Sequence, residues 1–178
     1  MGKLRVAWTL RSYIRQLRKA TSTLSSIPGP LGGEPQVCVG FVFEGKREVS
    51  FPNLQSLSDW FHAHVRAVPA RTNRPPTTYD PFHDCQQLIF THMDLNLRDI
   101  MIGKDGLIWI IDCGCAGFYP KWFEYMSTYY AECWDGPASW IHCIPFITDP
   151  YIERVRWIQA AVIISDDRQY GRDGKDVA

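Results

Sequence analysis

Residues 90–101 read FTHMDLNLRDIM and lead into two short hydrophobic runs, IMI at 100–102 and LIWII at 107–111. The residues between these runs are GKDG, and Asp-Gly at such a position is a strong signal for a β-hairpin. The sequence therefore predicts an antiparallel strand pair here. A further run, LIF at 88–90, predicts a short buried strand just before the loop.

Three carboxylates flank this hairpin. Asp94 and Asp99 lie in the turn before it, and Asp112 follows its last strand. Because a hairpin brings its two ends together, we expect Asp112 near Asp99, with the loop of Asp94 facing both. Clustered carboxylates are unfavourable unless a cation neutralises them, and such oxygen ligands suit Mg²⁺. Phosphoryl transfer uses these parts, but the alternative is that they are ordinary turn and strand-end residues.

The composition narrows the class of protein. The chain has 178 residues, 46% of them hydrophobic, and a formal net charge of zero. That excludes a typical disordered chain and argues against a nucleic-acid partner, which a basic excess would favour. Without an apolar run of about 18 residues or a secretory signal, we expect no membrane partner and a cytoplasmic location. The six cysteines are expected to be free thiols.

Apolar residues at steps of three and four predict a helix over 3–24 and, after an Asn53 cap, another over 54–68. After Pro120 the chain also looks helical, over 121–134 and 149–164. Basic residues of the first predicted helix lie largely off its apolar stripe: Arg11, Arg15, Arg18 and Lys19. They either face solvent or bind a phosphate or acidic partner.

Other segments are predicted from composition. The β-favouring run at 37–43 predicts a strand. Pro- and Gly-rich residues 25–33 and the polar residues 69–82 predict loops. Gly136-Pro137 and Ile144-Pro145 are expected to interrupt the helices. Residues 166–178 are polar and expected to fray.

The pattern H-x-D-L at 92–95, followed by the hairpin and I-I-D at 110–112, resembles the catalytic and metal-binding loops of aminoglycoside phosphotransferase/choline-kinase-like enzymes. AGFYPKWFEY at 116–125, YIRQLR at 13–18 and PGPLG at 28–32 resemble the branch of that family common in filamentous fungi. The resemblance implies an α+β, mainly helical domain over 1–165. It would be like the C-terminal (large) lobe of the protein-kinase-like fold, with a short β-hairpin carrying the metal-site loop.

Position by position, the resemblance implies roles for five residues. Asp94 matches the catalytic aspartate that orients the substrate hydroxyl or accepts its proton, and His92 matches the motif histidine, which is mostly structural. Asp112 matches the magnesium-binding aspartate. Asp99 stands where the family has the asparagine that binds a second metal. Asn96, Asp99 and Asp112 are accordingly expected to bind the cofactors that the resemblance implies, Mg²⁺ and ATP.

Three departures from the family pattern shape the expected function. Asp99 adds a negative charge, and Cys113-Gly114 replaces a Trp-Glu pair. The β-rich small lobe, with its lysine and phosphate-covering loop, is expected to be missing. We therefore expect a truncated kinase-fold remnant or ligand-binding module with weak or no ATP-dependent phosphotransfer.

Two alternatives stay open. One is a phosphotransferase that uses Mg-ATP on a small-molecule hydroxyl. The other is a scaffold repurposed for another reaction in specialised metabolism, its cleft lined by aromatics such as Trp122, Tyr125 and Trp140. The expected partners are a small molecule in the cleft and a second copy or partner chain, which would cover an apolar or concave face left by the missing lobe.

Overall fold

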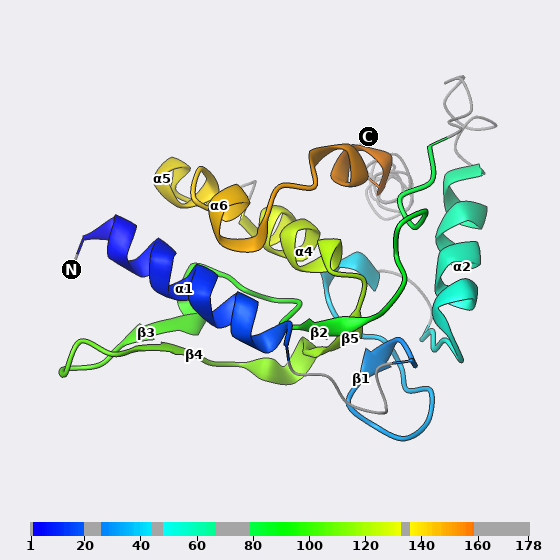
Figure 1. Cartoon of the computed structure of the whole chain (residues 1–178), viewed down its shortest axis with the longest axis horizontal. Coiled ribbons are helices and arrows are strands. Elements are labelled where there is room, and N and C mark those ends of the chain that lie inside the picture. The colour runs from blue at the N-terminus through cyan, green and yellow to red at the C-terminus, as the bar shows by residue number, and fades with distance from the viewer. Residues whose placement is uncertain (1, 20–25, 44–47, 67–78, 133–135, 159–178) are drawn as a thin grey trace, which may run out of the picture.

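The computed structural model describes residues 2–19, 26–43, 48–66, 79–132 and 136–158. Its fold is mixed α+β, with small antiparallel sheets, as predicted. Figure 1 shows α1 lying between the α4–α6 helices above and the β3–β4 hairpin below, with α2 at the far end. The helices are α1 (Lys3–Leu17), α2 (Leu54–Arg66), α4 (Trp122–Glu132), α5 (Ala138–Ile141) and α6 (Ile144–Thr148), and residues 152–158 are also helical. The strands are β1 (Gly29–Pro30), β2 (Ile89–Thr91), β3 (Ile100–Ile102), β4 (Ile108–Ile110) and β5 (Gly117–Tyr119).

The predicted hairpin is confirmed. Strands β3 and β4 pair in antiparallel register, with Met101 opposite Trp109. In the turn, Gly106 has a φ of 79°, a conformation that glycine adopts without strain. At the open end, the Ile111 N–H donates to the Asp99 carbonyl oxygen at 2.9 Å. The hairpin therefore brings the residues before β3 and after β4 to one place.

A second sheet was not predicted. Strands β1, β5 and β2 form it in that order, so two residues of the predicted Pro- and Gly-rich loop pair with β5. The two backbones approach closely because Gly117 has no side chain. A Cβ atom there would lie 2.2 Å from the Gly29 carbonyl oxygen.

The strand predicted over 37–43 is wrong. Residues 37–40 are irregular and Phe41–Phe43 form a single 3-10 turn. Gly40 has a φ of 120°, which breaks an extended run, and the Phe43 N–H donates to the Gly40 carbonyl oxygen at 2.9 Å. The turn lets Phe43 enter the core, where its ring lies 6.1 Å from that of Phe61. Tertiary packing has overridden β propensity here.

The helix predictions were confirmed in outline. Asn53 caps α2, its side-chain oxygen accepting from the Ser56 N–H at 2.9 Å. Helix α1 ends at Leu17 instead of residue 24. The helical run is interrupted between α5 and α6, and Pro145 lies in the first turn of α6, where its missing N–H is no loss. None of the helices in the described ranges has the length and hydrophobicity to cross a bilayer.

Parts of these predictions lie outside the described residues: the helix ends at 20–24, 67–68, 133–134 and 159–164, the loop at 69–78, and the tail at 166–178.

The core is aromatic and centred on α4. Trp122 and Phe123 are fully buried at its start. The Phe123 ring stacks on Tyr119 at 5.8 Å and meets Phe61 of α2 edge-on at 5.6 Å. Such pairs add about 0.5–1.5 kcal/mol each beyond the area they bury. Helix α4 is thereby fixed against both α2 and β5.

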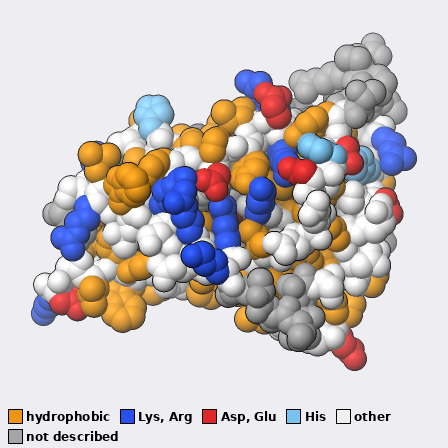
Figure 2. Space-filling model, in the orientation of Figure 1, with side chains coloured by type: hydrophobic (Ala, Val, Ile, Leu, Met, Phe, Trp, Pro, Cys, Tyr) orange, Lys and Arg blue, Asp and Glu red, His pale blue; other side chains and the backbone are white. Residues whose placement is uncertain are grey.

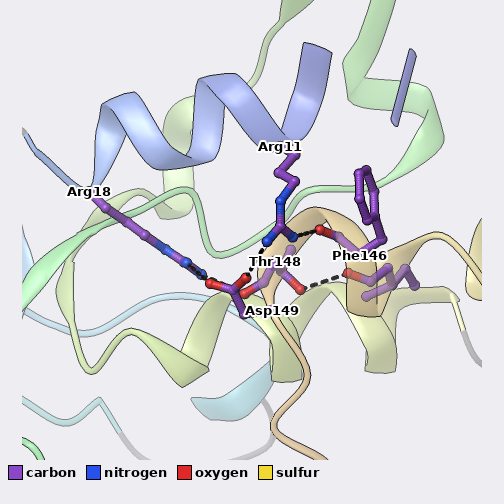
Figure 3. Close-up of polar contacts among 6 residues, drawn as sticks. Arg11, Arg18, Phe146, Thr148 and Asp149 are labelled. Carbon is purple, nitrogen blue, oxygen red and sulfur yellow. Dashed lines mark hydrogen bonds and ion pairs between the residues drawn. The ribbon is translucent and has the colours of Figure 1, made fainter. Parts of the chain in front are cut away.

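Arg11 of α1 and Arg18, the residue just after α1, bind the end of α6 and the aspartate that follows it (Figure 3). Arg11 contacts one carboxylate oxygen of Asp149 at 3.1 Å and Arg18 contacts the other at 2.6 Å. Arg11 also donates to the Phe146 carbonyl oxygen, and Arg18 donates to the Thr148 carbonyl oxygen at 2.5 Å. The sequence left open whether these basic residues bind an acidic partner. For Arg11 and Arg18, that partner is Asp149 of the same chain.

This ion pair predicts a pH-dependent loss of stability. Partial burial raises the pKa of Asp149, but hydrogen bonding to Arg18 and the charges of Arg18 and Arg11 outweigh it, so the pKa lies below its ordinary value. The stabilisation is complete above the ordinary pKa of Asp, about 4, and is lost as the pH falls through the lowered pKa.

We expect Asp149→Asn to lower the free energy of unfolding at pH 7 by about 1–2 kcal/mol, less than for a fully buried pair, because water screens the contact. Urea unfolding at pH 7 and at about pH 2 would measure this, and the difference from wild type should shrink in acid. Arg15→Ala, at an exposed position of α1, should change stability by less than about 0.5 kcal/mol. A difference that persists undiminished in acid would contradict the ion-pair explanation.

Candidate functional site

The loop between β2 and β3 is organised by Asn96. This side chain is 1% exposed, and its oxygen accepts from the Arg98 N–H at 3.0 Å. Its amide nitrogen donates to both the backbone oxygen and the carboxylate Oδ1 of Asp94, each at 3.2 Å. Arg98 approaches the same Oδ1 at 3.9 Å. Both ends of the Asn96 amide are used within the loop, so Asn96 positions Asp94.

Two buried glutamates of α4 accept hydrogen bonds from the backbone of this loop. Glu124 accepts from the His92 N–H at 2.7 Å and from the Met93 N–H at 3.3 Å, through different carboxylate oxygens. Glu132 accepts from the Leu97 N–H at 3.0 Å. Met93 has a φ of 68°, and strained conformations of this kind persist where surrounding contacts fix them.

The sequence analysis missed both glutamates. The signal that could have found them is a pair of acidic residues eight positions apart, on the same side of a helix that is otherwise buried. Burial raises the pKa of Glu124, and the hydrogen bonds from the His92 and Met93 N–H groups oppose that effect. Buried acids of this kind are retained where they accept from backbone donors.

His92 joins the loop to the end of the hairpin. The side chain is buried, and its Nε2 lies 3.0 Å from the Ile111 carbonyl oxygen. This contact fits the structural role that the resemblance implied for His92. The other ring nitrogen, Nδ1, is buried with no hydrogen-bond partner among the described residues.

Asp99 is the most constrained of the three aspartates. The residue is 5% exposed, and its Oδ2 is buried without a hydrogen-bond partner among the described residues. Burial raises the pKa of Asp99, the charges of Asp94 and Asp112 raise it further, and Arg98 and His92 oppose the shift. Asp112 is exposed and has a left-handed φ of 61°. The hairpin thus brings Asp99 and Asp112 to its base, within electrostatic reach of Asp94.

These carboxylates do not form a closed metal cage. Within the described ranges, no group of three or more His, Cys, Asp and Glu side chains is arranged to hold a metal ion. Mg²⁺ in nucleotide sites uses one or two carboxylates together with substrate phosphates and water. Asp99 and Asp112 could supply such a pair, and the unpartnered Oδ2 of Asp99 fits a cation.

The aromatic residues expected to line one cleft do not share one. Trp122, Tyr125 and Trp140 are all buried. Trp122 belongs to the central core, Tyr125 packs on Tyr129, and Trp140 lines a cavity with Lys3. The expectation of a cleft formed by all three is therefore wrong. Large aromatic side chains are stabilised by burial, and these three are buried in different places.

Two cysteines follow Asp112, in a 3-10 turn at Cys113–Cys115. The five cysteines in the described residues are free thiols, as predicted, and Cys133 lies outside them.

Comparisons of the chain with protein-family models, curated proteins and solved structures gave no match.

We expect removal of the Glu124 carboxylate to loosen the loop. Glu124→Ala leaves two buried N–H groups without acceptors and should lower the free energy of unfolding by about 2–4 kcal/mol. Glu124→Gln keeps one acceptor oxygen and should lower it by less. Urea unfolding would give the stabilities, and amide hydrogen exchange at His92 and Met93 should be faster in both variants.

A matched control for this series is Glu153→Ala, at an exposed position near the end of the described chain. It should change stability by less than about 0.5 kcal/mol. The proposed support of the loop would be disproved by a Glu124→Ala variant as stable as this control.

Asp99→Asn should stabilise the ligand-free protein. Because the folded-state pKa of Asp99 is raised, ionisation of this carboxyl favours unfolding, and stability falls as the pH rises above the ordinary pKa. Removing the charge should therefore raise the free energy of unfolding by about 1 kcal/mol at pH 7 and have little effect at about pH 3, where the group is protonated in both states. Thermal or urea unfolding at the two pH values would test this. Destabilisation at pH 7 would contradict it.

Proposed function

We propose that this chain is a kinase-like large lobe that binds a magnesium–nucleoside triphosphate at the base of the β3–β4 hairpin, with weak or no phosphotransfer of its own. The resemblance of its loops to those of aminoglycoside phosphotransferase/choline-kinase-like enzymes supports the choice of ligand. The order of the elements also supports it, since the loop of Asp94, the hairpin and Asp112 follow one another along the chain.

One observation carries the proposal: Oδ2 of Asp99 is buried, has no hydrogen-bond partner in the described part of the chain, and lies near two more carboxylates. A buried polar atom without a partner is unfavourable, and like charges nearby make ionisation more so. A cation between Asp99 and Asp112 removes both penalties at once. A purely structural turn would leave them uncompensated.

Each residue then has a distinct task. Asp99 and Asp112 hold Mg²⁺, which when bound neutralises charge on the phosphates. Asn96 and Arg98 both contact Oδ1 of Asp94, which orients this carboxyl and leaves Oδ2 to accept a proton from a hydroxyl. Glu124 and Glu132 fix the backbone that carries these groups.

The exposure of the site supports weak activity. Asp112 is exposed and the Asp94 side chain is 32% exposed. Electrostatic stabilisation of a phosphoryl-transfer transition state is strong only where water is excluded. Cys113-Gly114, in place of the Trp-Glu pair of the resembling enzymes, adds no bulk that could shield Asp112.

An exposed apolar surface beside the site supports a further partner. Met101, Leu107 and Trp109 are 51%, 53% and 55% exposed. Figure 2 shows hydrophobic side chains gathered at the end of the molecule that carries the hairpin. A second copy or partner chain seated there would bury this surface and exclude water from Asp112.

Calorimetric titration with Mg-ATP tests the proposal. Wild-type protein should bind, omission of Mg²⁺ should abolish the heat, and Asp112→Ala should weaken binding at least tenfold, about 1.4 kcal/mol. Asp59→Ala, which removes an exposed aspartate of α2, should bind like wild type. No heat with the wild-type protein would contradict nucleotide binding. ADP formation at about 1 s⁻¹ or faster with a hydroxyl acceptor would show that the chain is an active phosphotransferase and not only a binding module.

A further inference from the structure

A cavity of about 410 Å³ lies where the start of α1 meets β3 and α5 (Figure 1). Its volume is in the range of small-molecule sites, about 300–1,000 Å³. Most of its wall is aliphatic and is formed by Val6, Ala7, Leu97, Ile100, Ile102 and Pro137. None of the three aspartates is among the described residues that line this cavity, so it is separate from the nucleotide site proposed above and does not depend on it.

Two exposed polar side chains meet at this cavity. Lys3 of α1 and Ser139 of α5 both line it, and Lys3 Nζ donates to Ser139 Oγ at 3.0 Å. An ammonium group has three donors, so two remain on Lys3, and the Ser139 hydroxyl keeps its own hydrogen to donate. No carboxylate in the described part of the chain forms an ion pair with Lys3. The pair therefore offers accessible donors to a ligand.

The charge of the cavity wall favours an anion. Of the described residues that line it, Lys3 is positively charged and none is acidic. The first turn of α1 has no acidic side chain either, so nothing in that turn offsets the positive end of the helix dipole. A carboxylate accepts through two oxygens, which matches the donors of Lys3 and Ser139 together.

We propose that this cavity binds an ionised aliphatic carboxylic acid, with the hydrocarbon chain between α1 and β3 and the carboxylate hydrogen-bonded to Lys3 and Ser139. The chain leaves water for an aliphatic wall, which is favourable. The carboxylate stays beside two exposed side chains, so it is not transferred unpaired into the interior. The bound chain also contacts Leu97 and Ile100, the residues on either side of Arg98 and Asp99.

The test compares octanoate with octanamide, which has the same chain and an uncharged head, in calorimetric titrations without Mg²⁺ or nucleotide. Wild-type protein should bind octanoate at least tenfold more tightly. Lys3→Gln should remove this preference. Arg5→Gln removes the same charge from the same turn of α1, at an exposed residue that does not line the cavity, and should leave octanoate binding unchanged. No binding of octanoate, equal binding of the two compounds, an unaltered preference in Lys3→Gln, or equal loss in both variants would overturn the proposal.

A second pair of variants tests where the hydrocarbon chain lies. Ile102→Asp places a carboxylate in the aliphatic wall and should weaken octanoate binding at least tenfold. Met101→Asp makes the equivalent change at the next residue of β3, which is about as exposed, points to the other face of the strand and does not line the cavity, so binding should be unchanged. Both side chains are exposed, so both variants should fold. Retained binding in Ile102→Asp, or equal loss in both variants, would exclude this cavity as the binding site.

Discussion

The carboxylate of Glu124 is the contact on which the site depends. It lies in the buried interior and accepts from two consecutive backbone N–H groups, those of His92 and Met93. These donors point into the protein because Met93 takes a left-handed conformation. Without an internal acceptor, that conformation would leave two buried donors unpaired. The acid and the unusual backbone therefore require each other.

Glu124 can do this because α4 is held in place by its own aromatic residues. Phe123 fixes the start of the helix against α2 and β5, and Glu132 at its end accepts from the N–H of Leu97. One rigid helix thus supports both ends of the loop. Of the carboxylates near this loop, Asp94 is held by Asn96 and Arg98, Asp99 is buried, and Asp112 is exposed.

The parts predicted from sequence were those governed by local rules. The Asp-Gly turn and the Asn53 cap act over a few residues, so the hairpin and α2 were recognisable without a partner structure. The 37–43 segment and β1 were misassigned because their conformations depend on Phe43 entering the aromatic core and on Gly117 admitting a neighbouring backbone. The three aspartates could be grouped from the hairpin alone. Glu124 and Glu132 could not, because their role is a contact between segments far apart in sequence.

The ion pair between Arg18 and Asp149 joins residues 131 positions apart. On the ribosome, α1 emerges long before Asp149, whose carboxylate neutralises Arg11 and Arg18. Until then the apolar stripe of Ala7, Leu10 and Ile14 has no α6 to cover it. Helix α1 is therefore made well before the segment against which it docks, and until then it presents a basic, amphipathic surface of the kind that chaperones bind.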